Sequence, residues 1–346
     1  MKLGLLPGKF SGHYAIDMDL VREAEDLGFD SAWTSEAWGN DAITPATWIL
    51  AQTKRLKVGT AIIQMSARTP SMAAMTAMTL HDLSGGRFIL GIGPSGPQVI
   101  EGWHGEAFGR PIAHTREYIE IIRKILQREG PLTYDGRHYQ IPFHGEGATG
   151  LGKPLKSIMH GDPSMPIYTA AITPAGLRAS AEVADGVFPI YMDPTRFDIL
   201  EGPLNEGFAK AGNGKSLADY KIAPFVAVEI GNDIEACRAP VKREMALYIG
   251  GMGARDKNFY NDYAKKLGYE AAAVEIQDHF LAGRRAEAEA AVPNELVDAV
   301  ALVGPKERVL ERVSVWKGAA AQGHIDTMVI RRPTRTALRV MAEAVL

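Results

Sequence analysis

The fold class is clearest in residues 71–98, which read SMAAMTAMTLHDLSGGRFILGIGPSGPQ. Segment 71–83 is rich in Ala, Met and Leu, which favour a helix, and the Gly85-Gly86 pair ends it. The apolar run 87–93 follows at once and predicts a buried strand that opens into a Pro-Ser-Gly-Pro loop. A helix joined by a short turn to a buried strand is the repeating unit of parallel α/β folds.

The same alternation extends in both directions from this unit. Apolar runs predict strands at 2–7, 30–34, 56–63, 87–93, 166–171, 186–190, 222–230 and 327–330. Helical spacing and end signals predict helices at 17–27, 45–53, 71–83, 114–127, 174–184, 195–212, 233–248 and 335–345. Strands separated by helices over 346 residues predict an α/β protein of the (β/α)8 TIM barrel class, with an open doubly wound sheet as the alternative. Residues 250–300 fit no β/α unit, so we predict one domain over 1–346 with a helical insertion before the last strand.

Composition limits the classes of function. Hydrophobic residues make up 46% and charged residues 23% of the chain, which is ordinary for a globular protein. The 38 basic and 41 acidic residues give a net charge of −3, which argues against a nucleic-acid surface. The single cysteine, Cys237, excludes an internal disulfide, and the histidines lack metal-binding spacing, so no metal site is expected. No apolar run reaches the ~18 residues of a membrane span, and no signal-peptide pattern is present, so we expect a cytoplasmic protein.

The active site of a (β/α)8 barrel lies at the C-terminal ends of the strands. The loop after the second predicted strand carries Glu36 beside two tryptophans, and the loop after the fourth carries Glu101 near Trp103 and His104. Carboxylates in apolar surroundings suit acid–base chemistry, so Glu36 and Glu101 are the candidate catalytic residues. The alternatives are a solvated or helix-capping carboxylate and, for His104, a surface or structural histidine.

Two further turns at strand ends are candidates for binding a cofactor. Residues 171–176, AITPAG, open a predicted helix whose free N–H groups and dipole suit a phosphate; a plain N-cap by Thr173 is the alternative. Residues 91–96, GIGPSG, have the glycine spacing of a dinucleotide fingerprint, but Pro94 constrains the turn and no acidic partner follows. Such a turn lets a ligand approach the backbone closely, and a tight loop that needs positive φ is the alternative.

Motifs spread along the chain, in one consistent order, carry a family resemblance. They are GFDSAW at 28–33 followed by Ser35-Glu36, VGTAI at 58–62, LSGGRFILGIG at 83–93, ADGV at 184–187 and LVGPKE at 302–307. With them, the chain resembles the bacterial luciferase-like superfamily. Segments 93–98 and 101–105 are similar to its coenzyme F420-dependent branch, the relatives of methylenetetrahydromethanopterin reductase.

The resemblance implies that the deazaflavin coenzyme F420 binds over the barrel mouth, with FMN as the alternative cofactor. It implies these cofactor-binding residues: Ala61, Ile62, Gly93, Ser95, Gly96, Ala171, Ile172 and Thr173. The Ala61–Ile62 peptide is expected to be cis and to back the ring. The amides of 171–173 are expected to hold the phosphate, while Ser95 and Gly96 lie at the ring or ribityl chain and Glu36 near the reactive face.

The resemblance also implies an oxidoreductase that transfers a hydride between the deazaflavin C5 and a small organic substrate. An FMN-dependent monooxygenase and a flavin-binding protein without turnover are the alternatives. Several F420 enzymes of the family place a histidine directly after the acidic residue, where this chain has Ala37. Glu36 or Glu101 would then handle the proton, and the relatives' substrate does not transfer. A homodimer or higher homo-oligomer is expected, with helix 71–83 as a candidate face.

Overall fold

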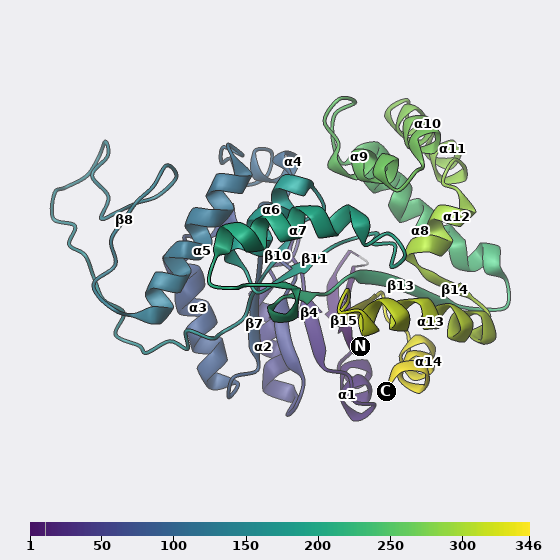
Figure 1. Ribbon diagram of the computed structural model, residues 1–346, viewed down its shortest axis with the longest axis horizontal. Coiled ribbons are helices and arrows are strands. Elements are labelled where there is room, and N and C mark those ends of the chain that lie inside the picture. Colours follow the sequence, from purple (N-terminus) through teal and green to yellow (C-terminus); the bar gives the residue numbers. More distant parts are fainter. Residues whose placement is uncertain (11) are drawn as a thin grey trace.

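Parallel strands form a closed barrel in the computed structural model, which describes residues 1–10 and 12–346 (Figure 1). Around the ring they are β1 (Lys2–Leu6), β4 (Ser31–Thr34), β5 (Lys57–Thr60) with β6 (Ile63–Gln64), β7 (Phe88–Gly93), β10 (Ile167–Ala170), β11 (Gly186–Phe188), β12 (Lys221–Ile222) with β13 (Phe225–Ile230), and β15 (Thr327–Arg331). The ring is closed because the seventh strand pairs with β11 through β12 and with β15 through β13, and β15 pairs in parallel with β1. The predicted (β/α)8 barrel is confirmed and the open doubly wound sheet is wrong.

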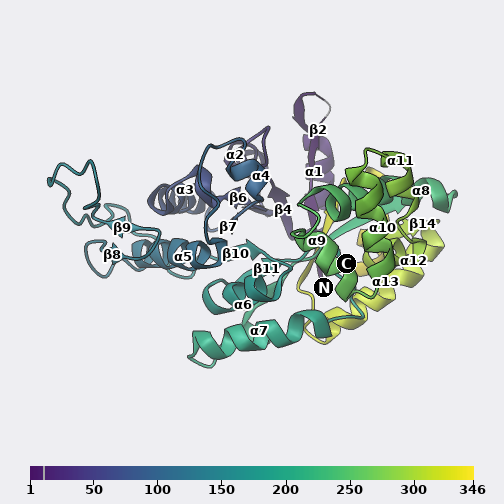
Figure 2. The same ribbon diagram turned by 90° about the horizontal axis from the view of Figure 1, so that it is seen from above.

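Helices surround the strands. They are α1 (Met18–Asp26), α2 (Ile43–Gln52), α3 (Pro70–Leu83), α4 (Pro97–Ile100), α5 (Pro111–Gln127), α6 (Pro174–Val183), α7 (Asp198–Ala211), α8 (Ile234–Ala246), α9 (Phe259–Lys266), α10 (Glu270–Leu281), α11 (Arg285–Ala290), α12 (Asn294–Val300), α13 (Lys306–Ala321) and α14 (Arg335–Val345). Seen from above, α5, α6 and α7 follow one another outside β7, β10 and β11 (Figure 2). Within the described ranges, no helix is long and apolar enough to cross a membrane.

Two barrel strands that the sequence predicts as continuous are each in two parts. The third is divided at Ala61–Ile62, a cis peptide bond, as the family resemblance implied. The seventh is divided near Pro224, which has no N–H to donate to a sheet. Its first part, β12, pairs with β11, and its second part, β13, pairs with β15. The division therefore lets one chain segment bridge the two sides of the ring.

The segment before the last strand holds α9 to α12, which lie together at one side of the barrel (Figure 1). A π-helical turn at Leu247–Gly251 extends α8 towards them. The sequence did not predict the short strand β14 (Leu302–Gly304), which pairs with the outer half of β13, or helix α13. Two small antiparallel hairpins, β2 (Gly8–Phe10) with β3 (Tyr14–Ile16) and β8 (Tyr134–Asp135) with β9 (Gln140–Ile141), were also not predicted.

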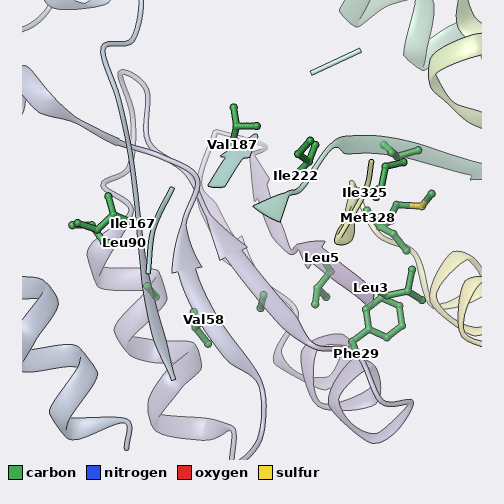
Figure 3. Close-up of a cluster of buried hydrophobic side chains, with 14 of the residues drawn as sticks. Leu3, Leu5, Phe29, Val58, Leu90, Ile167, Val187, Ile222, Ile325 and Met328 are labelled. Carbon is green, nitrogen blue, oxygen red and sulfur yellow. The ribbon is translucent and has the colours of Figure 1, made fainter. Parts of the chain in front are cut away.

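Two apolar layers stabilise the barrel. The larger lies between strands and helices, and Figure 3 shows part of it, including Leu3 and Leu5 of β1, Leu90 of β7 and Ile167 of β10. Each fully buried side chain of this size contributes about 1.5–3 kcal/mol relative to exposure. The smaller layer fills the barrel interior and centres on Trp33, which is 2% exposed. It forms the floor beneath the mouth.

Candidate functional site

The floor of the barrel mouth is aromatic and closely packed. The Trp33 ring stacks on Tyr168 at a centroid distance of 5.8 Å and meets the edge of Phe188 at 4.8 Å. A Cβ on Gly59 would lie 2.4 Å from the Trp33 ring, so only glycine leaves room for the indole there. Leu6, Ile62 and Phe225 pack against this cluster and are only partly buried. They give the mouth an apolar surface on which a planar ring can lie.

Three strand ends meet at Gly93. Its register partner is Gln64, and a Cβ built on Gly93 would lie 3.1 Å from Ile62 Cδ1 and 3.6 Å from Ala170 Cβ. Thus the residue after the cis peptide, the end of β7 and the end of β10 share one small space. The sequence listed Ile62 and Gly93 as separate candidates, and the fold brings them together.

The turn after β10 exposes backbone donors. The Ala171 N–H belongs to the end of the β10–β11 ladder, whereas the N–H groups of Ile172 and Thr173 donate no hydrogen bond to another residue within 1–10 and 12–346. Thr173 caps α6, because its Oγ1 accepts a hydrogen bond from the Gly176 N–H at 3.1 Å. The structure therefore confirms that Thr173 is the N-cap of α6, which the sequence offered as the alternative. This cap leaves the Ile172 N–H free to bind a ligand. Free N–H groups at the positive end of a ten-residue helix form a suitable cradle for an anion.

Three residues of the Gly91–Gly96 motif, at the end of β7 and in the turn after it, have different roles. Gly91 is required by close packing, because a Cβ there would lie 1.8 Å from the Thr60 carbonyl oxygen. Ser95 has φ of 58°, in the left-handed region, and Gly96 is the extended N-cap of α4 with φ of −106°. Positive φ is therefore found at Ser95 and not at the glycines of this motif.

The Glu36 carboxylate, a candidate acid or base from the sequence, is already engaged. Its Oε1 accepts hydrogen bonds from the Gln64 N–H at 2.6 Å and from Arg68 Nη1 at 2.7 Å. Its Oε2 accepts one from the Ala42 N–H at 3.0 Å, and its side chain is only 5% exposed. The arrangement ties the loop after β4 to the end of β6. Glu36 thus has the geometry of a positioning residue.

Glu101 lies apart from this network. It is exposed at the end of α4, and its side chain accepts one long hydrogen bond, from the Phe108 N–H at 3.4 Å. It borders a second, open hollow with Pro97, Gln98 and Gly102.

Sequence reasoning missed a polar group around Gln64. His104 Nε2 lies 2.5 Å from Gln64 Oε1, and Gln64 is 1% exposed. A hollow of about 160 Å³ adjoins them; it is lined by Glu36, Ala37, Gly39, Asn40, Asp41, Gln64, Ala67, Arg68, Trp103 and His104. His104 had a sequence signal, since it follows Glu101 closely in a strand-end loop. Gln64 and Arg68 had none, because neither belongs to a recognisable pattern.

These features fit a flavin-like group and give no indication of a metal. An apolar surface, a glycine beside it and free amides at a helix N-terminus match the ring and phosphate of such a molecule. In the part of the chain that the structure describes, no three His, Cys, Asp or Glu side chains are grouped to hold a metal ion.

Comparison with known proteins defines the class. The family described as luciferase-like monooxygenase matches residues 7–323, so this chain belongs to that family. A Mycobacterium tuberculosis protein, provisionally named coenzyme F420-dependent oxidoreductase Rv3520c, is 43% identical over 347 residues, covering 100% of this chain and 99% of its own. The 5,10-methylenetetrahydromethanopterin reductase of Archaeoglobus fulgidus is 28% identical and covers 85% of this chain and 83% of its own.

The particular branch follows from the first of these relatives, whose name points to coenzyme F420, as the sequence motifs predicted. Among solved structures, the coenzyme F420-dependent tetrahydromethanopterin reductase of Methanopyrus kandleri superimposes with a TM-score of 0.75 at 22% identity. That alignment covers 100% of this chain and 97% of the reductase. It confirms the fold along the whole length.

Proposed function

We propose that this protein is a coenzyme F420-dependent oxidoreductase that transfers a hydride between the deazaflavin C5 and a small organic substrate. The observation that carries the proposal is the junction at Gly93, where a Cβ at the end of β7 would meet both Ile62 and Ala170. One side of this junction offers an apolar surface for a ring and the other leads to the turn 171–173, where the Ile172 and Thr173 amides are free. The full-length relationship to a protein named for F420 supports the choice of cofactor.

Each part of the mouth has a definite task in this proposal. Ile62, with Ala61 before it, backs the ring, and Gly93 provides the space beside it. The turn of Ala171, Ile172 and Thr173 holds the phosphate through its free amides. Ser95 and Gly96 border the ring or the ribityl chain, since they follow Gly93 and Pro94 at the mouth.

Bound F420 supplies hydride chemistry, and the chain's own residues position the reactants and manage the proton. The closed floor beneath Ile62 keeps water from one side of the mouth, since Trp33 and Phe188 fill the interior. Substrate therefore approaches from the loops after β4 and β7. There the Glu36–Arg68 ion pair fixes the loop backbone that borders the substrate space.

An FMN-dependent monooxygenase is the second candidate, because the family takes its description from such enzymes. FMN carries a similar ring and a phosphate, so the same surface and amides would serve it. The two candidates differ in what binds and in what oxidises the reduced cofactor.

Fluorescence titration of the purified protein with F420 and, separately, with FMN tests the proposal. Reduced F420 is then mixed with a panel of enones and imines in a stopped-flow instrument. We expect saturable F420 binding and acceptor-dependent oxidation. Tight FMN binding without F420 binding would favour the monooxygenase, and F420 binding without any acceptor-dependent rate would favour a protein without turnover.

We also infer that the chain acts as a homo-oligomer through α3. Met72 and Met75 on this helix are 52% and 56% exposed, whereas Met78 is 2% exposed and belongs to the core. A pair of large exposed apolar side chains on one helix suits a subunit contact. Size-exclusion chromatography with light scattering should give a dimer or larger species, and M72K/M75K should lower its mass. A monomeric wild type would contradict the inference.

A further inference from the structure

His104 lies against the hollow beside Ala37, the position at which several F420 enzymes of the family have a histidine. Its loop, after α4, faces the loop after β4, and both border the hollow that contains Ala37. Ala37 is exposed and ends at a methyl group, so position 37 brings no titratable group to the hollow. The imidazole of His104 reaches the same hollow from the other side.

Gln64 determines which nitrogen of His104 carries the proton. The Gln64 side-chain amide donates from Nε2 to the Ala37 carbonyl oxygen at 2.9 Å, so its Oε1 must be the acceptor towards His104. Nε2 of the imidazole is therefore the donor in the 2.5 Å contact. Nδ1 has no hydrogen-bond partner among the described residues and is the nitrogen left for a ligand.

A buried network holds this arrangement in place. The Gln64 N–H bonds to Glu36, Glu36 pairs with Arg68, and Gln64 pairs in the β6–β7 ladder with Gly93. The network therefore connects the imidazole to the residue at which the ring is proposed to lie. Because these contacts already fix the imidazole of His104, little orientational freedom is lost when it transfers a proton.

We propose that His104 is the proton donor and acceptor of this enzyme, acting through Nδ1, with Gln64 as the residue that orients it. The proposal rests on the proposed F420-dependent function. The proposal also defines the class of substrate, which is a small molecule with a C=O, C=N or conjugated C=C bond. The atom that accepts the proton, either the O or N of the double bond or the acceptor atom of the conjugated system, faces the hollow.

The step balances. The substrate carbon receives a hydride, which is one proton and two electrons, from the reduced deazaflavin. The acceptor atom of the substrate receives the proton that leaves Nδ1 of the imidazolium, and its double bond becomes single. His104 is then neutral, with its remaining proton on Nε2 and bonded to Gln64, and it regains a proton from water. In the oxidative direction, neutral His104 takes the proton at Nδ1.

The other ionisable groups that line the hollow are engaged elsewhere. Glu36 and Arg68 pair with each other. Asp41 Oδ1 accepts a hydrogen bond from the Thr44 N–H at 2.7 Å, at the start of α2. His104 is therefore the group in the hollow whose ionisation should appear in a pH profile of activity.

His104→Gln is the decisive variant, because a glutamine amide can still donate to Gln64 but has no titratable nitrogen. The exposed His160→Gln, in the segment before β10, is the matched control. We expect H104Q to lose about 100-fold in kcat, within the 10²–10⁴ range of general acid–base catalysis. Its F420 dissociation constant should stay within about twofold of wild type. H160Q should match wild type in both, and H104Q should lose the wild-type pH dependence.

A readout independent of turnover tests the tautomer. Long-range ¹H–¹⁵N spectra of the ¹⁵N-histidine-labelled protein without cofactor, assigned by the signal that H104Q removes, should show His104 protonated at Nε2. Gln64→Leu should abolish this preference and lower kcat. A His104 protonated at Nδ1, or an H104Q enzyme with the kcat and pH profile of wild type, would overturn the assignment and leave the proposed function intact. A wild type that fails to bind F420 would overturn the proposed function and this assignment together.

Discussion

The Glu36–Arg68 pair gives the sharpest prediction about stability. Glu36 accepts three hydrogen bonds of 2.6–3.0 Å, and its side chain is 5% exposed against 20% for Arg68. Glu36→Gln keeps the volume but removes the charge and replaces one acceptor oxygen by a donor. Breaking a buried pair costs ~3–5 kcal/mol, and residual water access to Arg68 reduces this, so we expect a loss of about 2–4 kcal/mol.

Urea unfolding of the protein without cofactor, followed by tryptophan fluorescence and circular dichroism, measures this loss. Arg68→Met and the double variant E36Q/R68M complete the cycle. The double variant should be more stable than the sum of the single losses predicts, by about 1.5–3 kcal/mol. Single variants within about 0.5 kcal/mol of wild type, with additive effects, would refute the pairing. A large loss of kcat in E36Q with unchanged stability would return Glu36 to an acid–base role.

Three further predictions concern the mouth and the α5 helix. Gly93→Ala should push Ile62 towards the ring and raise the F420 dissociation constant about tenfold (~1.4 kcal/mol) in a fluorescence titration. The thermal midpoint of unfolding should stay nearly unchanged. An unchanged dissociation constant would contradict the binding of the ring beside Gly93. Thr173→Ala should remove the α6 cap, cost ~1 kcal/mol in urea unfolding and weaken F420 binding, whereas an effect on neither would contradict the phosphate turn. Burial, and then the neighbouring His138, lowers the pKa of His114 below its usual 6.5. The free energy of unfolding should therefore be highest above pH 6.5 and should fall as the pH drops through the folded-state pKa. H114Q should flatten this dependence, and an equal slope in both proteins would contradict it.

The barrel was predictable because its strands are short, apolar and separated by helices with clear ends. The 71–98 unit alone contains a capped helix, a turn and a buried strand, and the structure has α3 and β7 there. Strand β14 escaped prediction because three residues carry no measurable period, and its pairing with β13 is a long-range contact. The division of the seventh strand depends on Pro224, whose effect appears only when both neighbours of the strand are known.

The candidate site was predictable in its glycines and its strand-end turns, since these follow from chain order in a barrel. Roles of individual side chains were not. Glu36 looked like an acid because it stands among tryptophans in the sequence, but folding supplies it with Arg68 and two amides from other segments. The contact of His104 with Gln64 joins residues 40 positions apart, and no local pattern announces it.

The central claim is that the mouth binds F420, and the cofactor that accompanies the protein tests it most directly. The protein is purified from a host that makes both F420 and FMN, and the bound small molecule is identified by mass spectrometry after denaturation. The account predicts F420, near one molecule per chain. FMN in its place, with no trace of F420, would contradict the account.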